Sequence, residues 1–152
     1  VVHNAGMTRD ATLFTMGADA FRDCVAVNAA APYALTEALA LSKDAALVLL
    51  GSTSGVAGNA GQANYAAAKA SLAGWAASAD VRANVIAPGF IDSAMTAKIP
   101  ALTRCGGARF NSLGRPGAVE DVAHLAAHLL SPASAAVRGQ TLRVCGGFWG
   151  GR

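Results

Sequence analysis

The chain has 152 residues, the size of a single domain, and it is 53% hydrophobic and only 14% charged, which excludes a disordered chain. Its formal net charge is +3, and the basic residues are scattered rather than clustered with aromatic residues, so we expect no nucleic-acid partner. No apolar run is long enough to cross a bilayer, and no signal-peptide pattern is present, so we expect no membrane partner. Three cysteines without CxxC spacing favour reduced thiols and a cytoplasmic location.

The pattern of apolar runs, glycines and prolines predicts eight segments. In chain order these are a strand at 1–6, a helix at 19–41, a strand at 45–52, a helix at 64–79, a strand at 81–89, an irregular segment at 90–117, a helix at 118–131 and a strand at 139–147. Pro32 should kink the first helix or remove one of its hydrogen bonds. The alternation of strands and helices predicts an α/β fold, with a parallel sheet covered by helices on both faces.

Ligands of such sheets bind beyond the carboxyl ends of the strands, which directs attention to the residues after each strand. One of these stretches is GSTSGVAGNAGQANYAAAK, at residues 51–69. Its glycines do not have the GxGxxG spacing of a dinucleotide phosphate loop, and no acidic residue follows to hold a ribose. We therefore predict a loop that runs from Ser52 to about Asn64 and is not a phosphate cradle.

Tyr65 and Lys69 are four residues apart in the helix after this loop, so they share one helical face. An ammonium beside a phenol lowers the tyrosine pKa, and a phenol tuned in this way can exchange a proton with a carbonyl or alcohol oxygen. Ser52, at the end of a strand, could hydrogen-bond the same oxygen. The alternatives are a chance pairing of Tyr65 with Lys69 and an ordinary turn role for Ser52.

Several motifs resemble the short-chain dehydrogenase/reductase family when taken together in their order along the chain. They are HNAG at 3–6, VNAAAPYALTEAL at 27–39, Ser52 with Tyr65 and Lys69 in NYAAAK, NVIAPGFIDSAMT at 84–96, and VRGQTLRVCGG at 137–147. The resemblance covers essentially the whole chain. It implies a Rossmann-like, doubly wound parallel sheet in a single domain at 1–152, corresponding to the C-terminal portion of the family's domain. The N-terminal phosphate-loop βαβ unit would be missing.

The resemblance also assigns the site. Tyr65 would be the general acid, Lys69 would lower its pKa and bind the nicotinamide ribose, Ser52 would orient the substrate carbonyl, and Asn28 would hold a water in a proton relay. The cofactor, NADPH or NADH, would be contacted by these residues: Asn4, Ala5, Gly6, Tyr65, Lys69, Pro88, Gly89, Ile91 and Ser93. The residues alone do not single out Asn28, because a buried asparagine in a helix commonly satisfies backbone groups.

Within the family, GNAGQANYAAAKA and APGFIDSAMT are most similar to the FabG-type 3-oxoacyl-[acyl-carrier-protein] reductases, with some features of their high-molecular-weight branch. This similarity implies reduction of a 3-oxoacyl thioester, carried on acyl-carrier protein or coenzyme A, in fatty-acid biosynthesis. A homodimer or homotetramer is expected. The alternatives are a family member that acts on a sugar, steroid or small ketone, and a non-catalytic homologue.

Three further features complete the sequence predictions. His124 and His128 have metal-pair spacing on a helix, but no third ligand accompanies them, so we predict no metal site. The irregular segment around 94–117 is expected to be a lid over the substrate. The connections at ALSKDAAL and SADVRA are short, so we expect the chain to be part of a longer protein.

Overall fold

The computed structural model of the chain describes residues 1–94, 96–98 and 109–148. Its centre is a sheet of four parallel strands in the order β1-β2-β3-β4. The strands are β1 (Val2–His3), β2 (Ala46–Leu50), β3 (Arg82–Pro88) and β4 (Thr141–Val144). Since all four are parallel, their carboxyl ends lie at one edge of the sheet.

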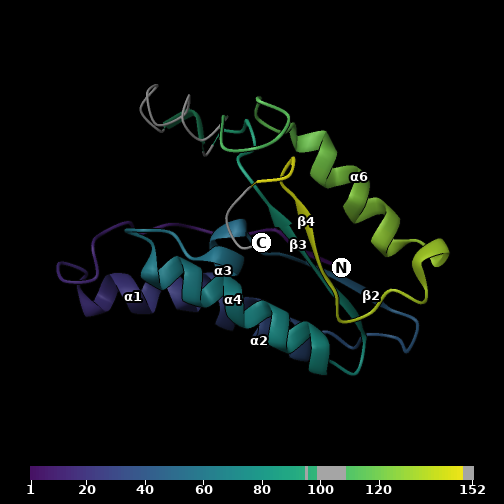
Figure 1. Ribbon diagram of the computed structural model, residues 1–152. Helices are drawn as coiled ribbons and strands as arrows, with labels where there is room; N and C mark the ends of the chain where they lie inside the picture. Colours follow the sequence, from purple (N-terminus) through teal and green to yellow (C-terminus); the bar gives the residue numbers. More distant parts are fainter. Residues whose placement is uncertain (95, 99–108, 149–152) are drawn as a thin grey trace.

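Helices cover both faces of this sheet (Figure 1). They are α1 (Ala18–Val25), the π-helix η1 (Ala26–Ala30), α2 (Ala31–Ala38), α3 (Thr53–Ala57), α4 (Ala63–Ser78), the 3-10 helices η2 (Thr96–Lys98) and η3 (Pro132–Ser134), and α6 (Val119–Leu130). In Figure 1, α1, α2 and α4 lie together on one side of the sheet and α6 lies on the other. The predicted α/β architecture is thus confirmed.

The continuous apolar run of β2 has two buried faces, as a central parallel strand requires. Leu47 and Leu49 belong to a cluster with Leu72 of α4. Val48, which points the opposite way, belongs to a second cluster with Leu129 of α6. The side chains of successive β2 residues therefore hold α4 and α6 on opposite faces.

The predicted first helix is confirmed in position, but its interior irregularity is not at Pro32 itself. The helix passes through the π-helical turn η1 before continuing into α2, and the N–H of Ala31 bonds to the carbonyl of Ala26. Pro32 lies at the start of α2, where its missing N–H is tolerated. The wide turn places Asn28 on the buried side of the helix.

The prediction that residues 52–64 form only a loop is wrong. Thr53–Ala57 make the short helix α3, and Ser52 is its N-cap. Segment 39–45 joins α2 to β2, and segment 79–81 joins α4 to β3. Of the predicted lid, residues 95 and 99–108 lie outside the described residues.

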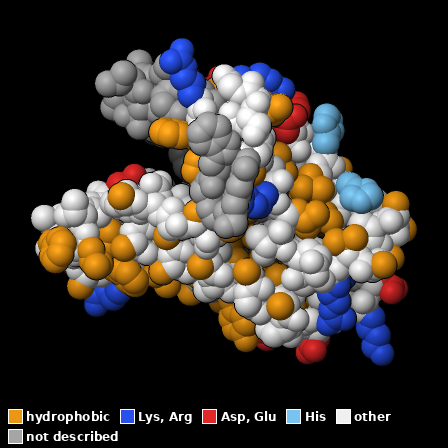
Figure 2. All heavy atoms as spheres, viewed as in Figure 1, with side chains coloured by type: hydrophobic (Ala, Val, Ile, Leu, Met, Phe, Trp, Pro, Cys, Tyr) orange, Lys and Arg blue, Asp and Glu red, His pale blue; other side chains and the backbone are white. Residues whose placement is uncertain are grey.

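The surface combines scattered charges with exposed apolar side chains (Figure 2). Phe14 is fully exposed and Leu13 is 69% exposed in the segment before α1. Across the described part of the chain, no helix has both the length and the apolar character to span a membrane.

Candidate active site

Lys69 lies between the carboxyl ends of β1 and β2. Its side chain is only 5% exposed, and its Nζ donates a hydrogen bond of 2.6 Å to the carbonyl oxygen of Leu50, the last residue of β2. On the β1 side, a Cβ added to Gly6 would lie 3.5 Å from the same Nζ. A buried cation is therefore fixed at the sheet edge where ligands of parallel sheets bind.

Ser52 and Tyr65 meet beside this cation. The Ser52 Oγ accepts a hydrogen bond of 3.1 Å from the backbone N–H of Ser54, which caps the first turn of α3. The same hydroxyl forms a hydrogen bond that favours the ionised form of the Tyr65 phenol. The Lys69 Nζ lies 5.6 Å from the centroid of the Tyr65 ring. The structure thus brings together the serine, tyrosine and lysine that the sequence singled out.

The pKa of Tyr65 departs from the sequence prediction. Burial raises the pKa of the phenol above its usual value of 10.0, and the hydrogen bond from Ser52 opposes this without reversing it. The predicted lowering by Lys69 is therefore wrong for the chain as described here. The Lys69 cation lies over the face of the phenol ring, and burial of the hydroxyl outweighs any lowering.

Burial also changes Lys69. Removal from water disfavours the ammonium and lowers the pKa of Lys69 from 10.5 to about 8. At neutral pH the side chain is still mostly charged, but its proton is available for transfer much closer to neutrality than that of an exposed lysine. The raised pKa of Tyr65 keeps the phenol protonated at neutral pH, and the lowered pKa of Lys69 lets the ammonium release a proton near neutrality.

Asn28 is fully buried in the π-helical turn, and its side chain hydrogen-bonds the segment that follows β1. Its Nδ2 donates to the carbonyl oxygens of Met7 and Cys24, each at 2.8 Å, and its Oδ1 accepts from the N–H of Met7 at 3.2 Å. These bonds match the backbone-satisfying role that the sequence left open. The water relay through Asn28 stays a prediction.

Asn64 is a positioning residue that the sequence reasoning missed. It is fully buried next to Tyr65, and its Oδ1 accepts from the Tyr65 N–H at 2.7 Å. Its Nδ2 donates to the carbonyl oxygens of Arg9 at 2.9 Å and Ala20 at 3.2 Å. One side chain thus joins the segment after β1, helix α1 and the start of α4. Its only sequence signal was a polar residue at the first turn of an otherwise alanine-rich helix.

The predicted cofactor residues after β3 are held by main-chain and hydroxyl contacts. The N–H of Gly89, which follows Pro88, donates to Val144 at 2.9 Å. The carbonyl of Ile91 accepts from the Thr96 hydroxyl at 2.7 Å, and the Ser93 hydroxyl lies 3.3 Å from the same Thr96 oxygen. This turn is therefore preorganised at the carboxyl end of a central strand.

A nicotinamide nucleotide fits the donors at this edge. The Lys69 ammonium and the Ser52 and Tyr65 hydroxyls converge there, and Asn4 and Ala5 are exposed after β1. A Cβ at Gly6 would lie 3.5 Å from the Lys69 Nζ, so the backbone after β1 passes close to the ammonium. These groups suit a ribose and a carboxamide, both of which are read by hydrogen-bond donors and acceptors.

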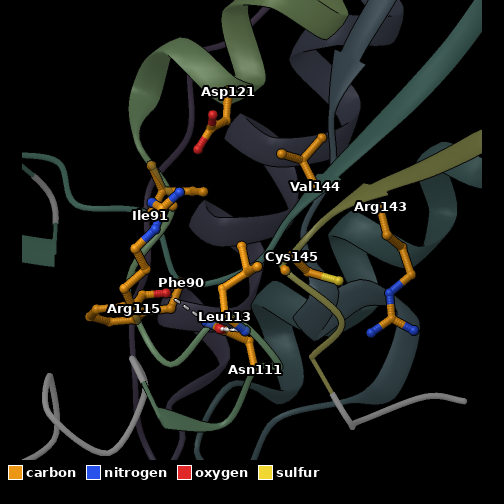
Figure 3. Close-up of a pocket in the computed structure, with 11 residues that line it drawn as sticks. Phe90, Ile91, Asn111, Leu113, Arg115, Asp121, Arg143, Val144 and Cys145 are labelled. Atoms are coloured by element: carbon orange, nitrogen blue, oxygen red, sulfur yellow. Dashed lines mark hydrogen bonds between the residues drawn. The ribbon is translucent and has the colours of Figure 1, made fainter.

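A separate cavity of about 300 Å³ lies beyond the ends of β3 and β4 (Figure 3). Ile91 lines it, together with Asn111, Leu113, Asp121 at the start of α6, and Cys145 after β4. Ser52, Tyr65 and Lys69 do not line it. The cavity thus adjoins the predicted cofactor turn without containing the Ser–Tyr–Lys cluster.

The two helical histidines are exposed on α6, where pale-blue side chains are visible in Figure 2. The described residues contain no group of three or more His, Cys, Asp or Glu side chains placed to hold a metal ion. His124 and His128 are thus an exposed pair without a described third ligand.

The fold and the site define the class of the protein: a Rossmann-like α/β chain with a partly buried Ser–Tyr–Lys cluster at the carboxyl edge of its sheet. A family model described as "Enoyl-(Acyl carrier protein) reductase" (adh_short_C2) matches residues 1–149. The chain belongs to the short-chain dehydrogenase/reductase family, as the sequence motifs predicted.

Curated relatives narrow the comparison. The chain is 38% identical to the 3-oxoacyl-[acyl-carrier-protein] reductase FabG of Salmonella typhimurium and 39% identical to that of Pseudomonas aeruginosa, with 98% of the chain aligned. It covers 66% and 65% of these relatives. The crystal structure of 3-oxoacyl-[acyl-carrier protein] reductase from Brucella melitensis superposes with a TM-score of 0.89 at 27% identity, covering 97% of this chain and 62% of that one. The chain therefore spans just under two thirds of the length of these relatives.

Proposed function

We propose that the protein containing this chain reduces a 3-oxoacyl thioester to the 3-hydroxyacyl thioester. The observation that carries the proposal is that the Ser52 hydroxyl and the Tyr65 phenol, both half-buried, lie together beside the buried Lys69 ammonium at the carboxyl edge of the sheet. The names of the FabG relatives support the substrate class and a role in fatty-acid biosynthesis.

In this reaction a reduced nicotinamide, when bound, supplies the hydride to the substrate carbonyl carbon. The Ser52 hydroxyl donates a hydrogen bond to the carbonyl oxygen and holds it beside Tyr65. Tyr65 gives its proton to that oxygen as negative charge develops there, which is general acid catalysis. Because burial keeps the Tyr65 pKa above 10.0, the phenol is protonated and ready to donate at neutral pH.

Lys69 then restores the proton and favours the transient phenolate. Its ammonium lies over the Tyr65 ring, and burial lowers its pKa to about 8, so it can release a proton near neutrality. Asn28 holds Met7 and so shapes the segment beside Lys69. In the proposal Asn28 also places a water that reconnects Lys69 to solvent.

The cofactor would be NADPH or NADH. Its nicotinamide side would meet Lys69 and Tyr65 and the turn that contains Pro88, Gly89, Ile91 and Ser93. Asn4, Ala5 and Gly6 would line its adenosine side. The support for these assignments is their placement after β1 and β3, at the edge where such sheets bind nucleotides.

The proposed carrier of the substrate is acyl-carrier protein or coenzyme A, and the proposed assembly is a homodimer or homotetramer in the cytoplasm. The support for the carrier is the name of the FabG relatives, which are 3-oxoacyl-[acyl-carrier-protein] reductases. Size-exclusion chromatography with light scattering would measure the assembly directly.

The test is oxidation of NADPH or NADH by the full-length protein in the presence of acetoacetyl thioester, followed for the wild type and for Tyr65→Phe. We expect turnover by the wild type and a loss of about 100-fold or more in the variant, because general acid catalysis commonly contributes 10²–10⁴-fold. No oxidation of either cofactor by the wild type would overturn the proposal. Turnover only with a sugar, steroid or small ketone would replace the substrate class, and equal rates in both proteins would remove the role of Tyr65.

A further inference from the structure

Gly55 is the point at which α3 touches α4. A Cβ at Gly55 would lie 2.8 Å from the carbonyl carbon of Lys69, 2.9 Å from the nitrogen of Ala70 and 2.9 Å from the Lys69 Cβ. Two of these atoms belong to the main chain of a helix and cannot turn aside. Gly55 is not among the glycines with positive φ, so its requirement is for space and not for an unusual backbone conformation.

The position of Ser52 is tied to this contact. Ser52 is the N-cap of α3, its Oγ accepts from the N–H of Ser54 at 3.1 Å, and its carbonyl accepts from the N–H of Gly55 at 3.0 Å. Because α3 is only five residues long, Ser52 moves with it as one unit. Tyr65 and Lys69 belong to α4, on the other side of the contact.

We propose that Gly55 is a positioning residue that sets the distance between the Ser52 hydroxyl and the Tyr65 phenol. The absence of a side chain lets α3 approach the backbone of α4 at Lys69, and this approach carries the Ser52 hydroxyl to the phenol. The catalytic consequence rests on the proposed function, whereas the geometric claim does not.

The size of the effect follows from the contact distances. Ordinary contacts of a Cβ begin at 3.4 Å, so a methyl group at Gly55 requires the two helices to separate by about half an ångström or more. A misplacement of about 1 Å can reduce turnover about 100-fold, so Gly55→Ala should lower kcat by about tenfold or more. It should also weaken the hydrogen bond that lowers the Tyr65 pKa.

A second contact also joins α3 to the start of α4, and its effect on the site must be measured separately from that of the Gly55 contact. The Ser54 hydroxyl donates to the Gln62 Oε1 at 3.1 Å. Ser54→Ala removes this bond and retains both the backbone cap at Ser52 and the close approach at Gly55. If the close approach sets the geometry, Ser54→Ala should behave like the wild type.

The experiment compares Gly55→Ala with Gly74→Ala in the full-length protein. Gly74 is exposed on α4, and a Cβ there would meet nothing within 4 Å, so the control adds the same methyl group to the helix without a clash. Two quantities are measured: kcat for reduction of acetoacetyl thioester, and the Tyr65 pKa from phenolate absorbance without cofactor. The pKa measurement uses the difference between each protein and the same protein with Tyr65→Phe, which isolates this phenol.

We expect Gly55→Ala to lower kcat about tenfold or more and to raise the Tyr65 pKa, with Gly74→Ala unchanged in both. Wild-type kcat and pKa in Gly55→Ala would overturn the proposal. If Gly55→Ala does not fold, Ser54→Ala is the deciding variant, because it removes the other contact between α3 and α4. Wild-type kcat and Tyr65 pKa in Ser54→Ala support the proposal, and a raised Tyr65 pKa overturns it. An inactive wild type would refute the proposed function alone, because the titration still reports on Gly55.

Discussion

Replacing Asn64 with leucine should destabilise the fold and disturb the candidate site together. Asn64→Leu keeps the branched shape of the side chain but removes the acceptor for the Tyr65 N–H and the donor to the carbonyls of Arg9 and Ala20. Arg9 is exposed, so water can replace the bond there. The Ala20 carbonyl keeps its bond within helix α1, whereas the Tyr65 N–H loses its acceptor, so at about 1–3 kcal/mol for a buried unsatisfied group the free energy of unfolding should fall by about 1–3 kcal/mol.

The measurement is urea unfolding of the full-length protein at one fixed protein concentration, because assembly is linked to stability. The control is Asn59→Leu, since Asn59 is exposed and its amide bonds only the neighbouring Gln62 among the described contacts. We expect the control to change the free energy of unfolding by no more than about 0.5 kcal/mol. Equal stability of Asn64→Leu and Asn59→Leu would refute the structural role of Asn64.

Three further predictions concern the cluster itself. Gly6→Ala should lower kcat about tenfold or more, because its methyl group would lie 2.9 Å from the Asn28 Oδ1 and would push apart the segment after β1 and the helix beside Lys69; Gly17→Ala, where a Cβ meets nothing within 4 Å, should not, and equal kcat values would contradict this. From pH 8 to pH 10 the free energy of unfolding of the wild type should rise relative to that of Lys69→Met. The reason is that the unfolded lysine keeps its proton up to its pKa of 10.5, whereas the folded lysine loses it at about 8. A difference in calorimetric melting temperature that stays constant over this pH range would contradict this. Ser52→Ala should raise the Tyr65 pKa by removing a hydrogen bond that lowers it, and a difference titration of phenolate absorbance that shows no rise would count against the Ser52–Tyr65 contact.

The strands and the main helices were predictable because their signals are local. The apolar run of β2 indicated a strand buried on both faces, and it packs against α4 and α6 as that pattern requires. The spacing of Tyr65 and Lys69 placed them on one helical face before any fold was known. Ser52 followed because it ends a strand, where ligands of parallel sheets bind.

Helix α3 was missed because its sequence favours a loop. TSGVA contains a glycine and two small hydroxyl residues, which have weak helical propensity. The single turn forms because Ser52 caps it and because Gly55 packs on the backbone of Lys69. The contact of Gly55 with Lys69 is tertiary, so a local pattern could not reveal it.

The role of Asn64 and the pKa of Tyr65 were hidden for the same reason. The partners of Asn64 at Arg9 and Ala20 are 55 and 44 residues away in the chain. The pKa of Tyr65 depends on how deeply the phenol is buried, whereas the sequence showed only that a lysine lies one turn away. The spacing therefore singled out the proposed general acid, Tyr65, but gave the wrong direction for its pKa.

The central claim is that Tyr65 donates the proton that completes reduction of a 3-oxoacyl thioester. It is tested most directly by single-turnover oxidation of NADPH or NADH with acetoacetyl thioester, comparing the full-length wild type with Tyr65→Phe at pH 7. The proposal predicts turnover by the wild type and a rate about 100-fold or more lower in the variant. The same rate in both proteins would contradict it.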